Sequence, residues 1–504
     1  MVALVDRVTD LRQLVAEVVD LSQVAALVGW DQETMMPPKG ARYRATQQAA
    51  LHGIIHERLT DRRIGDHLDR LEDPLFHPDL SDVDRAMVRV IRRDYDRATK
   101  LPASLVRELA MVTTRGLESW REAREQSRWE LFAPDLKRII ELKRQEAACI
   151  GFRETAYDAL LDEFEPGATA AQLQTLFTDL RSDTVRLLEK IDRSGRTLDR
   201  SPFEQFYDSP GQLSFTEGIM RQLGFDFAAG RQDKSTHPFT TSFGPTDVRI
   251  TTRVDEHDLA VALYASIHEF GHGSYEQGVP DELVRIGLGD GASLGIHESQ
   301  SRLWENFIGR GLPFWTFALP RLRESFPTVE ANATPAMMVA ASNRVRRSLI
   351  RVEADEVTYN LHIIIRFEIE QRMIAGEIGI DDLPTVWNQL TRDYLGLVPP
   401  DDRNGVLQDT HWAAGLIGYF PTYSLGNVYG AQLWATLRRT IPDLDDRLAA
   451  GDFGVVLNWM RERIHRWGRR KLPAELIQEA TGEAPTPTYL VAYLNEKYGS
   501  LYGF

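Results

Sequence analysis

Apolar positions at helical spacing dominate this chain. Near the N-terminus they fall at Leu11, Leu14, Val15, Val18 and Val19, the pattern of an amphipathic helix within the first 60 or so residues. The same spacing predicts further helices over 83–98, 105–123, 136–150 and 170–191. Prolines punctuate these stretches, at positions 102, 134, 166 and 202. We therefore expect a mainly α-helical protein.

The organisation of the chain predicts one large helical body. No internal repeat, low-complexity segment or Gly/Ser linker divides the sequence. Length alone would allow two to four domains. Because nothing marks a boundary, we expect a single domain over 1–504.

The stretch 237–254 departs from the helical pattern. It contains two β-rich runs, 238–243 and 248–252, separated by the turn residues Gly244 and Pro245. A small sheet is therefore expected just before the next helix. Its free edge is suited to holding a peptide backbone by strand addition, and a purely structural hairpin is the alternative.

The next helix carries the most specific pattern in the chain. Residues 268–272 read His-Glu-Phe-Gly-His, which fits the zinc-peptidase pattern His-Glu-x-x-His. On a helix His268 and His272 lie one turn apart on the same face, so both imidazoles can reach one metal ion. Glu269 is placed to take a proton from a bound water. Asp255, with Asp258 three residues on, is the expected N-cap of this helix.

A catalytic zinc site needs a third protein ligand and keeps one open position. Glu298, within His-Glu-Ser-Gln at 297–300, is the best candidate, because a helical pattern follows it. Glu276 and Glu282 are alternatives. We expect the core of the metal site to lie within about 255–430.

Composition narrows the possible partners. The chain has 504 residues and a net charge of −15, with 43% hydrophobic and 26% charged residues. An acidic chain argues against nucleic acid or an anionic membrane as the main partner. Cys149 is the single cysteine, which excludes an intrachain disulfide and a thiolate-rich metal site. Asp6 and Arg7 interrupt the N-terminus, and Arg366 ends the apolar run 361–365, so we expect a cytoplasmic protein.

Further motifs occur in a fixed order along the chain. They are His-Pro-Phe at 237–239, Asp-x-Arg-x-Thr at 247–251, the 268–272 and 297–300 motifs, Ile-Arg-x-x-Ala-Asp at 350–355, and Gly-x-x-Gln-Asp-x-His-Trp at 405–412. The segment 29–37, Gly-Trp-Asp-Gln-Glu-Thr-Met-Met-Pro, also fits. On these motifs the chain resembles the carboxypeptidase Taq family, the thermostable HExxH metallocarboxypeptidases. The resemblance covers about 29–430.

The resemblance implies a zincin-like helical fold with a deep substrate groove and commonly a homodimer. It implies His268, His272 and Glu298 as metal ligands and Glu269 as general base and acid. It further implies one divalent ion per subunit, with zinc expected and cobalt as an alternative. The activity would be removal of single residues of broad type from the free C-terminus of peptides, with proline disfavoured.

Two kinds of substrate contact are also predicted. His411 is the first candidate donor to the oxygen of the tetrahedral intermediate, followed by Tyr423 and then Tyr419, although all three also suit a packing role. A bidentate arginine is the natural partner of a substrate carboxylate, and we expect Arg351 first and Arg249 second. Internal pairing of Arg351 with Glu353 or Asp355 is the alternative.

The second nitrogen of a metal-binding histidine usually meets a carboxylate. Position 302 is Arg, so we expect that carboxylate to come from elsewhere, with Asp355 and Asp247 as candidates. His362, in an apolar helical run, is expected to be a core histidine.

Two other functions remain open at this point. One is an endo-oligopeptidase or dipeptidyl carboxypeptidase on a similar scaffold. The other is a non-catalytic peptide-binding protein that retains the motif, and the intact Glu269 and three candidate ligands argue against it.

Overall fold

The structure is a computed structural model that describes residues 2–74, 77–327 and 332–504. Its backbone forms two compact units, each assembled from segments that are far apart in the sequence. The first unit comprises Met1–Thr99, Asp199–Ser342 and Leu433–Gly482, and the second Lys100–Leu198, Asn343–Gln432 and Glu483–Phe504. Because the segments interleave, no single linker marks the boundary in the sequence. The expectation of one domain over 1–504 stays a prediction.

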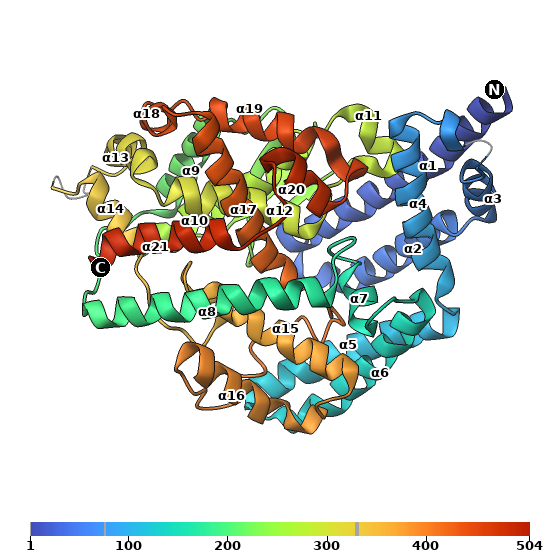
Figure 1. Ribbon diagram of the computed structural model, residues 1–504, viewed down its shortest axis with the longest axis horizontal. Coiled ribbons are helices and arrows are strands. Elements are labelled where there is room, and N and C mark those ends of the chain that lie inside the picture. The colour runs from blue at the N-terminus through green and yellow to red at the C-terminus, as the bar shows by residue number, and fades with distance from the viewer. Residues whose placement is uncertain (1, 75–76, 328–331) are drawn as a thin grey trace. The chain divides into compact units, whose positions relative to one another are not determined.

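Helices make up most of both units (Figure 1). The first unit contains α1 (Val2–Thr34), α2 (Ala41–Leu59), α3 (Arg62–Leu71), α4 (Asp82–Lys100), α9 (Ser209–Leu223), α10 (Leu259–Glu276), α11 (Asp281–Leu283), α12 (Leu294–Arg302), α13 (Leu312–Ser325), α14 (Pro335–Ser342), α18 (Leu444–Ala449), α19 (Gly454–Arg463) and α20 (Pro473–Thr481). The second contains α5 (Ala103–Gln126), α6 (Ala133–Ile150), α7 (Ala156–Leu161), α8 (Ala170–Ser194), α15 (Tyr359–Ala375), α16 (Leu383–Leu395) and α21 (Thr488–Tyr502). Helix α17 (Pro421–Thr440) begins in the second unit and ends in the first.

Short helical turns of other types connect these helices. They are η1 (Pro38–Gly40), η2 (His77–Asp79), η3 (Trp129–Leu131), η4 (Val284–Leu288), η5 (Leu303–Gly309), η6 (Arg351–Glu353), η7 (Ile380–Asp382) and η8 (His465–Arg470). Two of them, η4 and η5, are wider π-type turns. Such turns are often found at functional sites, and η5 directly continues α12.

The predicted helical stretches are confirmed. The patterns at 83–98, 105–123, 136–150 and 170–191 lie within α4, α5, α6 and α8, and the first 60 residues form α1 and α2. Their apolar stripes form the cores: Leu11 and Val15 of α1 are buried, as are Leu180 and Leu187 of α8. Periodicity therefore identifies both the helices and their inner faces.

A small sheet precedes α10, as expected. Strands β2 (Thr240–Ser242) and β3 (Val248–Thr252) pair antiparallel, with Thr240 opposite Ile250. A third strand, β1 (Gly230–Lys234), pairs parallel with β3 and was not predicted, because its sequence Gly-Arg-Gln-Asp-Lys is poor in β-forming residues. The order β1-β3-β2 leaves β2 at one edge. Val248 and Ile250 face Gly273 and join the sheet to α10.

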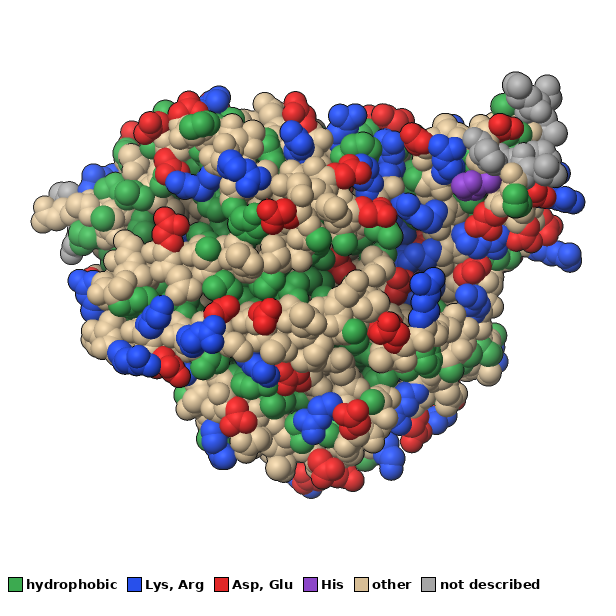
Figure 2. All heavy atoms as spheres, viewed as in Figure 1, with side chains coloured by type: hydrophobic (Ala, Val, Ile, Leu, Met, Phe, Trp, Pro, Cys, Tyr) green, Lys and Arg blue, Asp and Glu red, His purple; other side chains and the backbone are tan. Residues whose placement is uncertain are grey.

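Charged side chains of both signs are mixed over the face shown in Figure 2. On this face the acidic side chains are not gathered in one patch. Among the described residues, no helix is both long enough and apolar enough to cross a membrane.

Candidate metal centre and active site

Helix α10 begins one turn later than the sequence suggested. The Asp258 side chain caps it by accepting a hydrogen bond from the Ala260 amide at 3.1 Å. Asp255, the expected N-cap, instead accepts from the His257 amide at 2.9 Å. The prediction of Asp255 was wrong because both aspartates suit a cap, and the register of the helix selects the second.

A glycine lets α10 and α12 approach closely. A Cβ atom added to Gly271 would lie 2.4 Å from the Ser301 Cα and 2.6 Å from the Gln300 carbonyl oxygen. Backbone atoms cannot yield to such a contact, so any other residue would push the two helices apart. Gly271 therefore keeps the turn of α12 that carries Glu298 beside the histidines of α10.

The predicted ligand residues meet at this crossing. One ligand atom from each of His268, His272 and Glu298 can be chosen so that all lie within 4.8 Å of one another. Glu298 Oε2 is 3.6 Å from His268 Nε2 and 3.4 Å from His272 Nε2. The structure thus brings together the three residues predicted from the sequence. Of the two alternatives for the third position, Glu276 bonds to another side chain, described below.

Glu298 is held in its ionised form. Its Oε1 accepts from Arg302 Nε at 2.7 Å, and its Oε2 accepts from Ser301 Oγ at 3.0 Å. Burial alone would raise the pKa of Glu298, but Arg302 and the two histidines outweigh it and hold the pKa well below its usual range. The carboxylate is therefore charged and oriented toward the imidazoles.

A carboxylate of η5 orients His268. Glu305 Oε2 lies 2.9 Å from His268 Nδ1, which leaves Nε2 directed toward Glu298. Arg310 donates to the other Glu305 oxygen at 2.7 Å, and Arg302 approaches Oε2 at 3.3 Å. Glu305 was not recognised in the sequence. Its spacing of seven residues from Glu298, two helical turns, was the available signal.

His272 is oriented through a second histidine. Its Nδ1 lies 2.6 Å from His297 Nδ1, and His297 Nε2 lies 2.7 Å from Glu276 Oε1. The Glu276 carboxylate can only accept, so His297 carries its proton on Nε2 and donates it to Glu276. His297 Nδ1 then accepts a hydrogen bond from the protonated Nδ1 of His272. Nε2 of His272 therefore keeps its lone pair. Burial lowers the pKa of His272 to about 3, so the imidazole is neutral, as a metal ligand must be.

These contacts correct the expectation for the carboxylates behind the ligands. Glu305 and, through His297, Glu276 fill that role, and Asp247 and Asp355 do not. Asp247 pairs with Arg249, and Asp355 accepts from the backbone amides of Arg346, Val357 and Thr358. Both partners lie within two turns of a candidate ligand on the same chain segment, so proximity in the sequence was the signal that this expectation did not use.

Glu269 is set beside the ligands and bonded to the sheet. The Thr240 hydroxyl of β2 donates to Glu269 Oε2 at 2.7 Å. Glu269 is 5% exposed, and burial raises its pKa, with His268 and Thr240 opposing the shift. A carboxylate with a raised pKa, next to a metal position, has the properties of a general base.

The donor set fits a divalent metal ion. Two imidazoles and one ionised carboxylate converge, and each has a partner that fixes its orientation. The cluster holds three carboxylates, Glu269, Glu298 and Glu305. Two arginines, Arg302 and Arg310, contact Glu298 and Glu305, so carboxylates outnumber arginines. Nitrogen and oxygen donors in this number suit a catalytic zinc site or a related divalent ion.

The second unit contains a buried arginine pair, described here by itself. Arg351 donates to Asp409 Oδ1 from Nε at 3.1 Å and from Nη2 at 2.9 Å, and Arg366 Nε donates to Oδ2 at 2.7 Å. Arg351 is 6% and Arg366 0% exposed. Two guanidinium groups thus share one carboxylate, which leaves excess positive charge. The alternative expectation was that Arg351 pairs with Glu353 or Asp355. Its partner is Asp409 instead.

Arg366 and Asp409 were missed as site residues. Asp409 lies inside the 405–412 motif, and Arg366 stands in an otherwise apolar helix, which is the signal of a buried charge with a partner. Gln408 links the same groups, since its Oε1 accepts from the Arg351 amide and from Arg366 Nη2, each at 2.8 Å.

His411 lies among aromatic rings beside this pair. Its ring centre is 4.4 Å from Phe420, 5.4 Å from Tyr419 and 6.4 Å from Tyr423. No described residue hydrogen-bonds to His411 Nδ1, which is buried. Burial lowers the pKa of His411 to about 4, so it is a neutral donor near pH 7. The Arg351 guanidinium lies 5.2 Å from the Tyr423 ring.

Arg249 occupies a different setting in the first unit. Its Nε and Nη2 each donate to Asp247 at 2.9 Å, and its guanidinium lies 4.4 Å from the ring of Trp30. The side chain links the sheet to α1. Two nitrogens of its guanidinium group donate to Asp247. The predicted contact of Arg249 with the substrate stays a prediction.

Comparison with known proteins covers nearly the whole chain. Residues 10–498 match the family model of the carboxypeptidase Taq (M32) metallopeptidases. The chain is 43% identical to thermostable carboxypeptidase 1 of Thermus thermophilus, over 98% of both chains, and 39% identical to carboxypeptidase 1 of Bacillus subtilis, over 95% and 96%. The solved M32 carboxypeptidase from Deinococcus radiodurans is similar to it with a TM-score of 0.96, at 40% identity, over 99% of this chain and 100% of that one.

The family match spans both units and the metal-centre motifs. Matches of this length and identity leave no part of the two units outside the family. The chain therefore belongs to the carboxypeptidase Taq (M32) family and is a metal-dependent carboxypeptidase.

Proposed function

We propose that this enzyme removes single amino acids, of broad type, from the free C-terminus of peptides. The observation that carries this proposal is the buried pair Arg351 and Arg366 with its single carboxylate, Asp409. A buried excess positive charge is stabilised by an incoming anion, and a C-terminal carboxylate supplies one in the planar form that arginine binds in bidentate fashion.

Zinc is the proposed metal, with cobalt as the alternative, held by His268, His272 and Glu298. A divalent ion at this position would polarise the scissile carbonyl and make bound water more acidic. Glu305 and His297 would keep the two imidazoles in the tautomer that presents Nε2.

Glu269 is the proposed proton carrier. Its raised pKa and its bond to Thr240 suit a carboxylate that accepts a proton from water and then delivers it to the leaving amine. Thr240 occupies one Glu269 oxygen, which leaves the other for the reaction.

Three further residues are proposed to contact the substrate. His411, neutral and without a partner on Nδ1 among the described residues, is proposed to donate to the oxygen of the tetrahedral intermediate, together with Tyr423. Arg351 is proposed to bind the substrate carboxylate, with Arg249 as the second candidate. A homodimer and a cytoplasmic location stay predictions.

The test compares the wild type with Glu269→Gln on peptides with free or amidated C-termini, reading products by mass. We expect single residues to leave free C-termini only, and chelator to abolish the reaction. Glu269→Gln should lower kcat by about 10³-fold with unchanged metal content, because proton transfer is lost while the ligands remain. Cleavage of amidated peptides would favour an endo-oligopeptidase, and release of dipeptides a dipeptidyl carboxypeptidase. Full activity of Glu269→Gln would exclude the proposed mechanism.

A further inference from the structure

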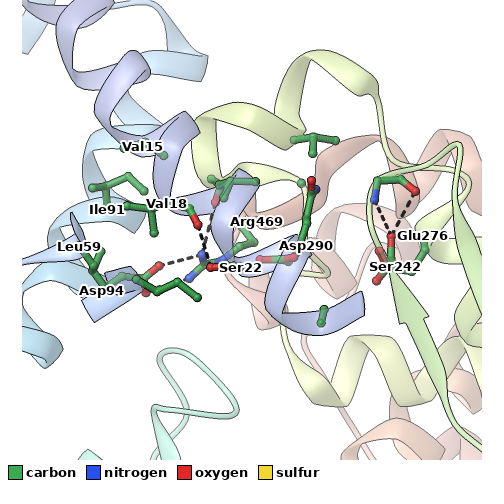
Figure 3. A pocket seen from close by; sticks show the side chains of 18 of the residues that line it. Val15, Val18, Ser22, Leu59, Ile91, Asp94, Ser242, Glu276, Asp290 and Arg469 are labelled. Atoms are coloured by element: carbon green, nitrogen blue, oxygen red, sulfur yellow. Dashed lines mark hydrogen bonds and ion pairs between the residues drawn. The ribbon is translucent and has the colours of Figure 1, made fainter. Parts of the chain in front are cut away.

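A cavity of about 420 Å³ lies in the first unit at the end of strand β2. One wall is apolar, formed by residues such as Val15 and Val18 of α1 and Ile91 of α4. Ser242 and Glu276 lie on the opposite side, and Asp290 and Arg469 lie between (Figure 3). The volume is in the range of ligand-binding pockets, and the lining combines an apolar surface with few charged groups.

The charges in this cavity do not balance. Arg469 donates to Asp94 from Nη1 at 2.8 Å and from Nη2 at 2.9 Å, and Arg93 Nη1 lies 3.3 Å from the same carboxylate, so the charge of Asp94 is already neutralised. Two more carboxylates, Asp290 and Glu276, line the cavity, and Glu276 Oε1 lies 2.7 Å from His297 Nε2. Asp290 is an exposed carboxylate that lines the cavity. The cavity therefore favours a cation.

Strand β2 leads from the catalytic carboxylate to this cavity. Thr240 contacts Glu269, and Ser242, two residues further along the edge strand, lines the cavity. A peptide added antiparallel to β2, the slightly more stable pairing, runs in the opposite direction. Its residues upstream of the bond at Glu269 then lie toward Ser242.

Helix α10 gives an independent measure of the distance. Glu276 lies two turns after Glu269 on the same face, which is about 10 Å at 1.5 Å per residue. An extended peptide covers that distance in about three residues at 3.3 Å each. The direction of β2 and the distance along α10 both place an upstream substrate residue at the cavity.

On the basis of the proposed carboxypeptidase activity, we propose that this cavity is a subsite for a lysine or arginine side chain about three residues upstream of the scissile bond. The aliphatic part of the side chain would pack against Val15, Val18 and Ile91, and its charge would meet Asp290 and Glu276. The subsite adds a preference at an upstream position to an enzyme of otherwise broad specificity.

The test uses N-acetylated peptides of equal length with the same free C-terminal residue. Lys, Leu or Glu is placed in turn at each position from two to five residues upstream of the scissile bond, and kcat/KM is measured. For the wild type we expect a preference of about tenfold for Lys over Leu at one of these positions, and a smaller preference at high salt. Acetylation removes the α-ammonium as a competing cation.

Three variants separate the cavity from general charge effects. Asp290→Asn should abolish the preference for Lys and leave kcat/KM for the Leu peptide unchanged. Asp281→Asn, an exposed carboxylate earlier in the same segment, is the matched control and should keep the preference. Val18→Lys, which places a cation in the cavity, should turn the preference toward Glu.

The outcomes distinguish the two proposals. Equal turnover of Lys and Leu peptides at every position, with single residues still released, would overturn the subsite and leave the carboxypeptidase proposal intact. A Lys preference that survives Asp290→Asn would also overturn it. Release of no residue from any peptide would instead contradict the proposed function.

Discussion

The metal centre of the first unit and the arginine pair of the second are both buried clusters with unbalanced charge, of opposite sign. The metal centre contains three carboxylates and two arginines, which contact two of the carboxylates, and at the arginine pair two guanidinium groups share one carboxylate. A buried excess charge is costly unless a ligand of opposite sign completes it. This difference in charge is the basis for the two proposed ligands, a cation in the first cluster and a substrate anion in the second.

The two clusters differ in how the chain assembles them. The candidate metal ligands come from two helices that cross at Gly271, and the side chains behind them come from the same segments. The arginine pair draws on η6, α15 and the loop at Asp409. Substitutions in the two clusters should therefore affect different properties.

The largest expected effect is on stability, in the arginine cluster. Asp409→Asn leaves two buried guanidinium groups without their anion, and the free energy of unfolding should fall by about 3–5 kcal/mol. Chemical denaturation measures the change. Asp445→Asn, which breaks the exposed pair with Arg438, is the matched control and should cost about 1 kcal/mol or less. Equal effects would show that the pair is not a buried unbalanced site.

The next effect is on metal binding in the first cluster. Glu298→Gln removes the charged ligand, and metal affinity should fall by about 10²- to 10³-fold. Competition with a chromophoric chelator measures it. Glu282→Gln, which changes the alternative third ligand, an exposed residue, should bind metal like the wild type. A larger loss in Glu282→Gln than in Glu298→Gln would reassign the third ligand.

A somewhat smaller effect separates the clusters by function. Arg351→Met should lower kcat/KM for peptides with a free C-terminus by about 10²-fold and leave metal affinity unchanged, because the loss concerns the substrate anion alone. Arg249→Met is the paired comparison. If Arg249→Met has the larger effect on kcat/KM, the second candidate is the carboxylate-binding residue.

The smallest effect is a pH dependence near the arginine pair. Burial lowers the pKa of His362 from 6.5 to about 3, with Arg366 contributing. Between these values the unfolded chain binds a proton that the folded chain does not. Neutral His362 therefore makes its full contribution to the free energy of unfolding above pH 6.5. This contribution is lost as the pH falls toward 3, and the loss at pH 4 is no more than about 3 kcal/mol.

His362→Leu removes this titration and keeps an apolar core position. The free energy of unfolding measured from pH 7 to pH 4 should then decline less steeply than in the wild type, by up to about 1.4 kcal/mol per pH unit. An unchanged slope would mean that His362 is protonated inside the fold.

The sequence was sufficient for the helices, the position of the sheet and the clustering of His268, His272 and Glu298. Helical periodicity is a local property, and His268 and His272 share a face by spacing alone. Glu298 required one further assumption, that a later helix crosses α10. Structure and comparison together support the fold and the family, and the roles of individual site residues await the experiments above.

Tertiary relationships were not predictable in the same way. The His272–His297–Glu276 series depends on which nitrogen of each ring faces its neighbour, and the shared Asp409 depends on three separate segments meeting. Strand β1 forms from polar residues because β3 offers it backbone partners, not because its own sequence favours a strand. In each case the deciding contact lies outside the local pattern.

The glycine at the helix crossing also constrains how this motif can vary. Gly271 is written as an unspecified position in His-Glu-x-x-His, yet a single added methyl group would meet backbone atoms of Ser301 and Gln300. In a saturation mutagenesis scan Gly271 should tolerate replacement as poorly as a metal ligand does, although it offers no donor atom. Protein engineers who transplant this motif would need to carry over the glycine with the histidines, because the gap it leaves sets the reach of Glu298.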